Sequence, residues 1–167
     1  PAPLSLKDFK ARSEYPSVLE AHSAVEYWVK GIAPHLLTLV GPPGVGKSHL
    51  AIAAAQLLSA EGRIMAYRLE APLLRGLQAS IKTGNTDGLI QELEEVPWLV
   101  LEELGLTASS DWGQEVLDRL INARWQNAGV LHTLITTNVK AAELPIRLAS
   151  RLGDVHTDRV IVIKASD

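Results

Sequence analysis

Residues 41–48 read GPPGVGKS, and their glycines, lysine and serine have the spacing of a phosphate-binding loop, G-x-x-x-x-G-K-[ST]. Glycine permits positive φ and close backbone approach, so consecutive N–H groups can point toward an anionic phosphate. Lys47 would neutralise charge on the β- and γ-phosphates, and the Ser48 hydroxyl would coordinate Mg²⁺. The stretch predicts a nucleotide-binding segment made of Gly41, Pro42, Pro43, Gly44, Val45, Gly46, Lys47, Ser48 and His49.

The alternative interpretation of this stretch is a glycine turn that caps an ordinary helix. The context favours phosphate binding, because the apolar run 35–40 precedes the loop and the helical pattern 49–60 follows it. A helix that starts at the loop would add its dipole to the attraction for phosphate.

Two adjacent carboxylates, Glu102 and Glu103, end the apolar run that begins at residue 98. A phosphate-binding loop needs an acid at the tip of another strand to hold the metal ion and to orient water. The alternative is a solvated strand end with a charged cap. Asn138 follows the next apolar run, where its carboxamide could orient water or contact the γ-phosphate, although strand-ending asparagines are common turn residues.

Arg147 and Arg151 are four residues apart, on one face of a short helix expected after Pro145. Such arginines are usually surface salt-bridge partners. Their functional interpretation is a finger inserted at a neighbouring subunit's γ-phosphate.

The elements that must position these residues are five apolar segments that alternate with helical patterns, as in βαβ units. The expected strands cover 35–40, 64–70, 98–104, 131–137 and 160–165. Between them we expect helices over 49–60, 71–84, 86–96 (capped by Thr86 or Asp87) and 112–127 (capped by Ser110 or Asp111). We expect residues 1–30 to form a helical lead-in.

Composition limits the function classes. Of the 167 residues, 47% are hydrophobic and 21% are charged, which is typical of a folded globular protein. We expect one domain over residues 1–167. The net charge of -3 excludes a global attraction for nucleic acid, and the absence of cysteine excludes disulfides and thiol catalysis. No run reaches the roughly 18 apolar residues of a membrane span, so a cytoplasmic protein without membrane contact is expected.

Several stretches together resemble the AAA+ ATPases of the DnaC, DnaI and IstB type, which are bacterial helicase loaders and transposition ATPases. The resemblance covers residues 5–165, and its most specific parts are GPPGVGKSHLA (41–51), LVLEELG (99–105), SSDWGQEVLDRLINARW (109–125), TTN (136–138) and LPIRLASRLGD (144–154). It implies an α/β P-loop NTPase fold, with helices flanking a five-stranded parallel sheet of order 5-1-4-3-2 and no C-terminal lid domain.

The resemblance also implies roles for single residues. Glu103 would be the catalytic glutamate, Asn138 the first sensor, and Arg151, or else Arg147, an arginine finger acting in trans. Active sites would then lie between subunits of a homo-oligomer whose assembly ATP promotes. The helices between the second and third strands match an insertion that faces single-stranded DNA, with Arg75 and Lys82 as phosphate contacts. The N-terminal partner-binding region of such proteins is expected to be absent here.

One residue departs from the family pattern, since Glu102 stands where aspartate is usual. The extra methylene moves the carboxylate outward, so hydrolysis could be slow even with intact nucleotide binding. The function expected is an ATPase using ATP and Mg²⁺ to load a replicative helicase onto single-stranded DNA. The alternatives are an IstB-like transposition ATPase, acting with a transposase on duplex DNA, and a nucleotide-dependent assembly switch with little hydrolysis. Phe9, in the lead-in, is the residue that we suggest for recognition of adenine.

Overall fold

The computed structural model describes residues 5–12, 15–105, 110–140 and 158–164. Two helices, α1 (Leu6–Arg12) and α2 (Pro16–Val29), precede the first strand and lie within the expected lead-in 1–30. The strands are β1 (Leu36–Val40), β2 (Met65–Leu69), β3 (Trp98–Glu102), β4 (His132–Thr137) and β5 (Asp158–Val162). The remaining helices are α3 (Lys47–Ala60), α4 (Glu70–Ser80), the 3-10 turn η1 (Ile81–Thr83), α5 (Thr86–Glu95) and α6 (Asp111–Gln126).

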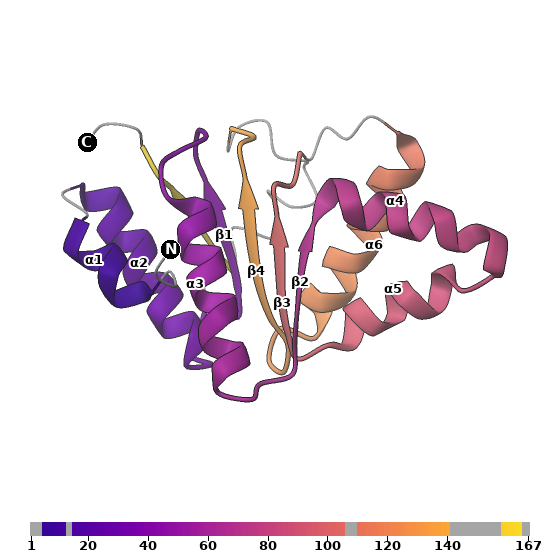
Figure 1. Cartoon of the computed structure of the whole chain (residues 1–167), viewed down its shortest axis with the longest axis horizontal. Coiled ribbons are helices and arrows are strands. Elements are labelled where there is room, and N and C mark those ends of the chain that lie inside the picture. The colour runs from indigo at the N-terminus through magenta and orange to yellow at the C-terminus, as the bar shows by residue number, and fades with distance from the viewer. Residues whose placement is uncertain (1–4, 13–14, 106–109, 141–157, 165–167) are drawn as a thin grey trace.

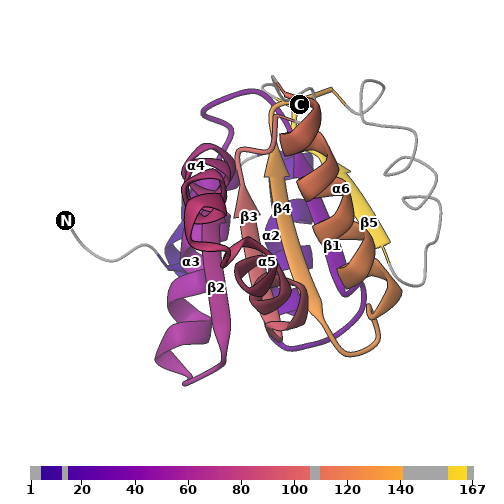
Figure 2. The same ribbon diagram turned by 90° about the vertical axis from the view of Figure 1, so that its right-hand side faces the viewer.

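The five strands form one parallel sheet in the order β2-β3-β4-β1-β5, which confirms the expected order. In this register Leu36 of β1 lies opposite Thr133 of β4, and Trp98 of β3 lies opposite His132. All carboxyl ends therefore meet at one edge of the sheet and all amino ends at the other (Figure 2).

Helices cover both faces of the sheet (Figure 1). The first face packs against α1, α2 and α3 through a core that includes Trp28, Leu37, Leu39 and Val100. The second face packs against α4, α5 and α6 through Leu99, Leu101, Leu117 and Ile135. Because successive residues of a strand point to opposite faces, strands covered on both sides are apolar at most positions, and the fully buried β1 and β3 are apolar except for Thr38 and Glu102.

The ends of some elements differ from the expectation. The third strand ends at Glu102, two residues early, because Glu103 adopts the left-handed conformation (φ 59°) and turns the chain. The fifth strand occupies Asp158–Val162 instead of 160–165. At α5, neither Thr86 nor Asp87 is the capping residue, since the helix starts after Asn85 without a side-chain cap. Ser110 does cap α6, and its hydroxyl accepts a hydrogen bond from the Gly113 N–H at 3.1 Å.

The described elements all belong to this sheet and its flanking helices, so no lid domain is present among them. The described helices also include none that combines the length and the apolar character needed to cross a bilayer.

Candidate functional site

The ends of β1, β3 and β4 bring the polar segments of the sequence to one place. Val40 lies opposite Thr137, and the Gly41 N–H donates to the Thr137 carbonyl at 3.2 Å. The Leu104 N–H likewise donates to the Thr136 carbonyl at 3.0 Å. The loop after β1, the acidic turn after β3 and the end of β4 are therefore tied together by backbone hydrogen bonds.

The glycines of the loop after β1 are required by its geometry. Gly44 and Gly46 have φ values of 84° and 107°, which side chains disfavour. At Gly41 a Cβ would lie 2.7 Å from the Ile163 carbonyl oxygen. Gly46 is the N-cap of α3, and no side chain caps its N–H groups. The loop thus leads into a helix N-terminus whose amides and dipole favour an anion.

Lys47 is buried, with 6% of its surface exposed. Its ammonium donates to the Gly41 carbonyl at 2.6 Å and to the Pro42 carbonyl at 2.8 Å. Burial lowers the pKa of Lys47, whereas the charges of Glu102 and Glu103 act to raise it. A cation held in this way is directed at the loop, where it can meet phosphate charge with little solvent screening.

Glu102 is almost completely buried at 1% exposure, so the interpretation as a solvated strand end does not hold for it. Its carboxylate accepts hydrogen bonds from the hydroxyls of Tyr67 and Thr136. Burial raises the pKa of Glu102, the nearby Ser48 hydroxyl lowers it, and the charge of Glu103 raises it further. Oxygen ligands on Ser48 and Glu102 suit a hard cation such as Mg²⁺.

Glu103 differs from its neighbour in direction. Its backbone is left-handed, and its N–H donates a hydrogen bond to the Thr136 hydroxyl at 3.1 Å. Its side chain lines a cavity beside the loop after β1. Strain of this kind in a non-glycine residue is often found at functional sites. The turn therefore separates the two carboxylates, with Glu102 directed into the protein and Glu103 toward the cavity.

A cavity of about 330 Å³ brings most of the expected site residues together. Its lining consists of Pro43, Gly44, Gly46, Lys47, Ser48, His49, Glu103, Thr136 and Asn138. Gly41 and Pro42 contribute their carbonyls to Lys47 instead. The site combines a buried cation, a hydroxyl, a carboxylate and a carboxamide around one space, which is a set suited to binding a polyphosphate and orienting water.

A second cavity, of about 250 Å³, adjoins the first and shares Gly44, Gly46 and His49 with it. Its other lining residues are Phe9, Tyr15, Val18 and Val45. The Phe9 ring centroid lies 4.9 Å from that of His49, and a Cβ at Gly46 would come within 2.8 Å of the ring. Flat aromatic and apolar groups beside a phosphate-type loop form a suitable environment for a nucleobase.

Other expected site residues lie elsewhere. Arg75 on α4 and Lys82 on η1 are both exposed, away from the two cavities. Arg147 and Arg151 lie outside the described residues. Among the residues that the structure describes, no group of three histidine, cysteine or acidic side chains could hold a metal ion. A metal at Ser48 and Glu102 would thus depend on oxygen atoms from a bound phosphate.

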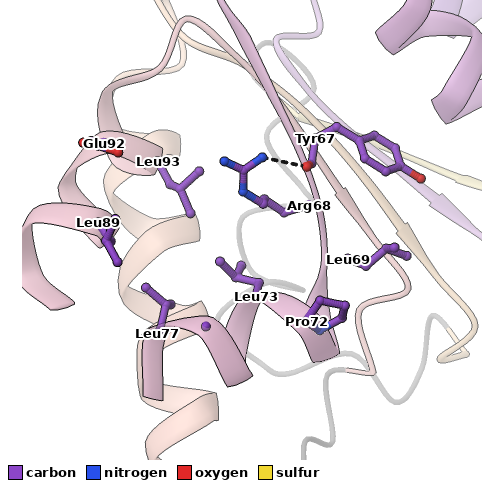
Figure 3. Close-up of a pocket in the computed structure, with 10 residues that line it drawn as sticks. Tyr67, Arg68, Leu69, Pro72, Leu73, Leu77, Leu89, Glu92 and Leu93 are labelled. Carbon is purple, nitrogen blue, oxygen red and sulfur yellow. Dashed lines mark hydrogen bonds between the residues drawn. The ribbon is translucent and has the colours of Figure 1, made fainter. Parts of the chain in front are cut away.

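A further pocket, of about 390 Å³, lies between β2, α4 and α5 (Figure 3). Leucines dominate its lining, and Arg68, at its rim, donates to the Tyr67 carbonyl at 2.8 Å. It has no glycine loop, and the helix that begins beside it, α4, carries the acidic Glu70 in its first turn, so the pocket is not suited to a polyphosphate.

Sequence reasoning missed Tyr67 and Thr136 as site residues. Thr136 could have been predicted from the sequence, because it belongs to the TTN stretch and lies at the same strand end as Asn138. Tyr67 carried a weaker signal, since its contact with Glu102 depends on which strands are neighbours.

Comparison with known proteins agrees with this geometry. Residues 8–161 match the family described as IstB-like ATP binding protein. The replicative helicase loader DnaC of Escherichia coli is 25% identical over 137 residues, and a putative ATP-binding protein of insertion sequence IS21 from Pseudomonas aeruginosa is 31% identical over 96. A crystal structure of the DnaC helicase loader superposes with a TM-score of 0.76 at 26% identity, covering 95% of this chain and 96% of that one.

The curated relatives are longer than the matching region. The match covers 81% of this chain but 54% of the DnaC loader, and 57% of this chain but 36% of the IS21 protein.

Proposed function

Because the chain belongs to the family of IstB-like ATP-binding proteins, we propose that it hydrolyses ATP with Mg²⁺ and that nucleotide state controls the loading of a replicative helicase onto single-stranded DNA. The observation that carries the ATPase part is the convergence of Lys47, Ser48, Glu103 and Asn138 on one cavity. The helicase part rests on similarity to the DnaC loader.

In this proposal the loop 41–46 and the start of α3 bind the triphosphate through backbone N–H groups. Lys47 transfers its hydrogen bonds from the loop carbonyls to the β- and γ-phosphates, where the charges attract more strongly. Ser48 and Glu102 would hold Mg²⁺, which neutralises negative charge on the phosphates when bound. The adenine ring would occupy the second cavity, against Phe9 and His49.

Glu103 and Asn138 act on the water that attacks the γ-phosphate. Glu103 lines the cavity as a carboxylate and accepts a proton from this water, while the Asn138 carboxamide fixes its direction. Arg151, or alternatively Arg147, would complete the site from a neighbouring subunit, so ATP promotes a homo-oligomer.

The first test is ATP turnover by the purified chain, by Lys47→Ala and by Glu103→Gln. We expect Glu103→Gln to retain ATP binding and to lose turnover by a factor of about 10² to 10⁴, the usual contribution of a general base. Binding without turnover in the unaltered chain would instead support a nucleotide-dependent assembly switch.

Contact with DNA is proposed at Arg75 and Lys82. Both side chains are exposed. They are seven positions apart, which is about two helical turns, and η1 follows α4 directly, so they lie on the same side of these two elements. Fluorescence anisotropy with an oligo-dT strand in the presence of Mg-ATP measures this contact. A double Arg75→Ala, Lys82→Ala variant should bind several-fold more weakly, with a smaller dependence on salt.

The similarity to the IS21 protein favours a second candidate, an ATPase that acts with a transposase. Binding assays with a purified replicative helicase and with an IS21-type transposase, each with and without ATP, separate the two. Capture of the transposase alone would overturn the loader proposal and leave the ATPase proposal intact.

A further inference from the structure

Tyr67 lies on the strand next to the acidic turn. It is opposite Val100 in the β2–β3 register, and Glu102 follows Val100 by two residues on the same face of the sheet. Diagonal neighbours of this kind are about 7 to 8 Å apart, a distance that a tyrosine side chain can span. In Figure 3 the Tyr67 ring points away from the pocket between β2, α4 and α5. Its hydroxyl donates to Oε2 of Glu102.

The Tyr67 hydroxyl is one of two hydroxyl donors to a single buried carboxylate. The other is Thr136 of β4, which donates to Oε1 of Glu102 at 3.4 Å. The two donors come from the two strands that flank β3, so the carboxylate is held from both sides, and the Ser48 hydroxyl at the start of α3 is near enough to lower its pKa. The Tyr67 contact is the one that fixes Oε2.

Glutamate at position 102 needs such a restraint more than aspartate would. Its side chain has one more rotatable bond, and a metal ligand must be held within about 0.5 Å of its productive position. Without the Tyr67 hydroxyl, Oε2 would lose its donor in a place that is 1% exposed.

We propose that Tyr67 is a positioning residue, whose hydroxyl fixes the Glu102 carboxylate against Ser48 and thereby sets the affinity of the nucleotide complex for Mg²⁺. This inference rests on the proposed function, since it assigns Tyr67 a part in the same site. Tyr67 is not expected to touch ATP, because it does not line either cavity of the site.

The test is a Mg²⁺ titration of Tyr67→Phe with a fluorescent ADP analogue already bound, so that metal binding is measured without turnover. We expect the Mg²⁺ concentration at half-saturation to rise by about 10-fold to 100-fold, the usual effect of removing a hydrogen-bond partner from a metal ligand. Binding of the analogue in EDTA should change by less than about twofold. In turnover assays, kcat should recover at high Mg²⁺.

A double-mutant cycle distinguishes positioning from general damage. In the Glu102→Ala background there is no carboxylate for Tyr67 to hold, so adding Tyr67→Phe should shift the Mg²⁺ requirement by less than about twofold. Tyr27→Phe, on an exposed tyrosine of α2, is the matched control. Tyr67→Met also lacks the hydroxyl and should give the same shift if Tyr67→Phe does not fold.

The outcomes separate the two proposals. An unaltered chain that binds Mg²⁺ and the analogue, combined with unchanged Mg²⁺ requirements in Tyr67→Phe and Tyr67→Met, would overturn the role of Tyr67 alone. An unaltered chain that binds no nucleotide would overturn the proposed function as well.

Discussion

Two buried cations lie at opposite edges of the same sheet, and their surroundings differ. Lys47, at the carboxyl edge, is 6% exposed, and Arg124, at the amino edge, is 1% exposed. Lys47 donates to two carbonyls of its own loop and faces a cavity, with the charges of Glu102 and Glu103 close by. Arg124 is bound on all sides by groups of the fold.

The guanidinium of Arg124 joins three elements. It donates to the Thr133 hydroxyl at 2.8 Å, to the Leu93 and Val96 carbonyls at 2.9 and 2.6 Å, and to the His132 carbonyl at 3.0 Å. These partners belong to α5, to the segment that follows it, and to β4, and none of them is a carboxylate. Burial lowers the pKa of Arg124 to about 10, which leaves it charged at neutral pH.

The difference shows how a binding cation can be told from a structural one. Arg124 satisfies carbonyls at the ends of elements, so its charge is used within the fold. Lys47 has carboxylates beside it and open space in front of it, so its charge is available to a ligand. Burial alone would have placed the two residues in the same class.

Replacing Lys47 with alanine is the largest expected effect. Loss of the buried ammonium should lower ATP turnover by a factor of about 10² to 10³, because phosphate charge in the transition state loses its principal side-chain donor. The free energy of unfolding of the nucleotide-free protein, measured in urea, should change by less than about 1 kcal/mol, since water can hydrate the two loop carbonyls in place of the ammonium. A large loss of stability would contradict the comparison.

Replacing Arg124 with methionine should act on the fold. The change leaves one buried and two partly buried carbonyls without this donor, and we expect the free energy of unfolding to fall by about 3 kcal/mol. ATP turnover per folded molecule, measured well below the midpoint of thermal unfolding, should stay within about threefold. Turnover that falls as far as in Lys47→Ala would remove the distinction between the two cations.

A smaller change at the amino edge is Thr133→Val, which removes one acceptor of Arg124 and keeps the side-chain volume. We expect the free energy of unfolding to fall by about 1.5 kcal/mol, because a buried N–H loses its partner. Thr136→Val on the same strand is the matched control at the carboxyl edge. That variant should lower turnover more than stability, and the reverse pattern would contradict it.

Acid should weaken the amino edge first. His132 stacks on Trp98 with the ring centroids 4.0 Å apart, and its Nδ1 is 3.1 Å from that of His35. Burial, followed by the charges of His35, Arg124 and Arg63, lowers the pKa of His132 to about 4. Because the unfolded chain binds this proton more readily, the stabilisation is complete above about pH 6.5 and is lost as the pH falls toward 4.

Urea unfolding between pH 8 and pH 4 measures this effect. The ring is partly exposed, so the effect is smaller than for a fully buried group. Between pH 8 and pH 4 we expect the free energy of unfolding to fall by about 1 kcal/mol more in the unaltered protein than in His132→Asn. Identical pH profiles for the two proteins would show that the histidine contributes nothing to acid sensitivity.

Local spacing in the sequence was enough to predict that Lys47, Ser48, Asn138 and the acidic pair that includes Glu103 lie near one another, because each follows directly from a strand end or from the loop motif. The parallel sheet and its helices followed from alternating apolar runs, and the strand order followed from the family resemblance. The exact ends of the helices and strands could not be predicted in this way. The left-handed conformation of Glu103 and the missing cap of α5 depend on tertiary hydrogen bonds, which residue propensities do not describe.

Contacts between distant segments were beyond sequence reasoning. Tyr67 reaches Glu102 only because β2 and β3 are neighbours, and Phe9 reaches Gly46 only because α1 packs beside α3. Arg124 belongs to α6, and its hydrogen-bond partners come from α5 and β4, which the sequence does not place beside it. The arginine-finger expectation for Arg151 stays a prediction, since that residue lies outside the described part of the chain.

The bond from the Arg68 guanidinium to the Tyr67 carbonyl has a consequence for self-association. Among the described strands β2 pairs only with β3, which makes it an edge strand. Unpaired edge carbonyls invite strand addition from another chain and, with it, aggregation. By covering one of these acceptors with a charged side chain, Arg68 helps to keep partially opened copies of the protein from joining edge to edge.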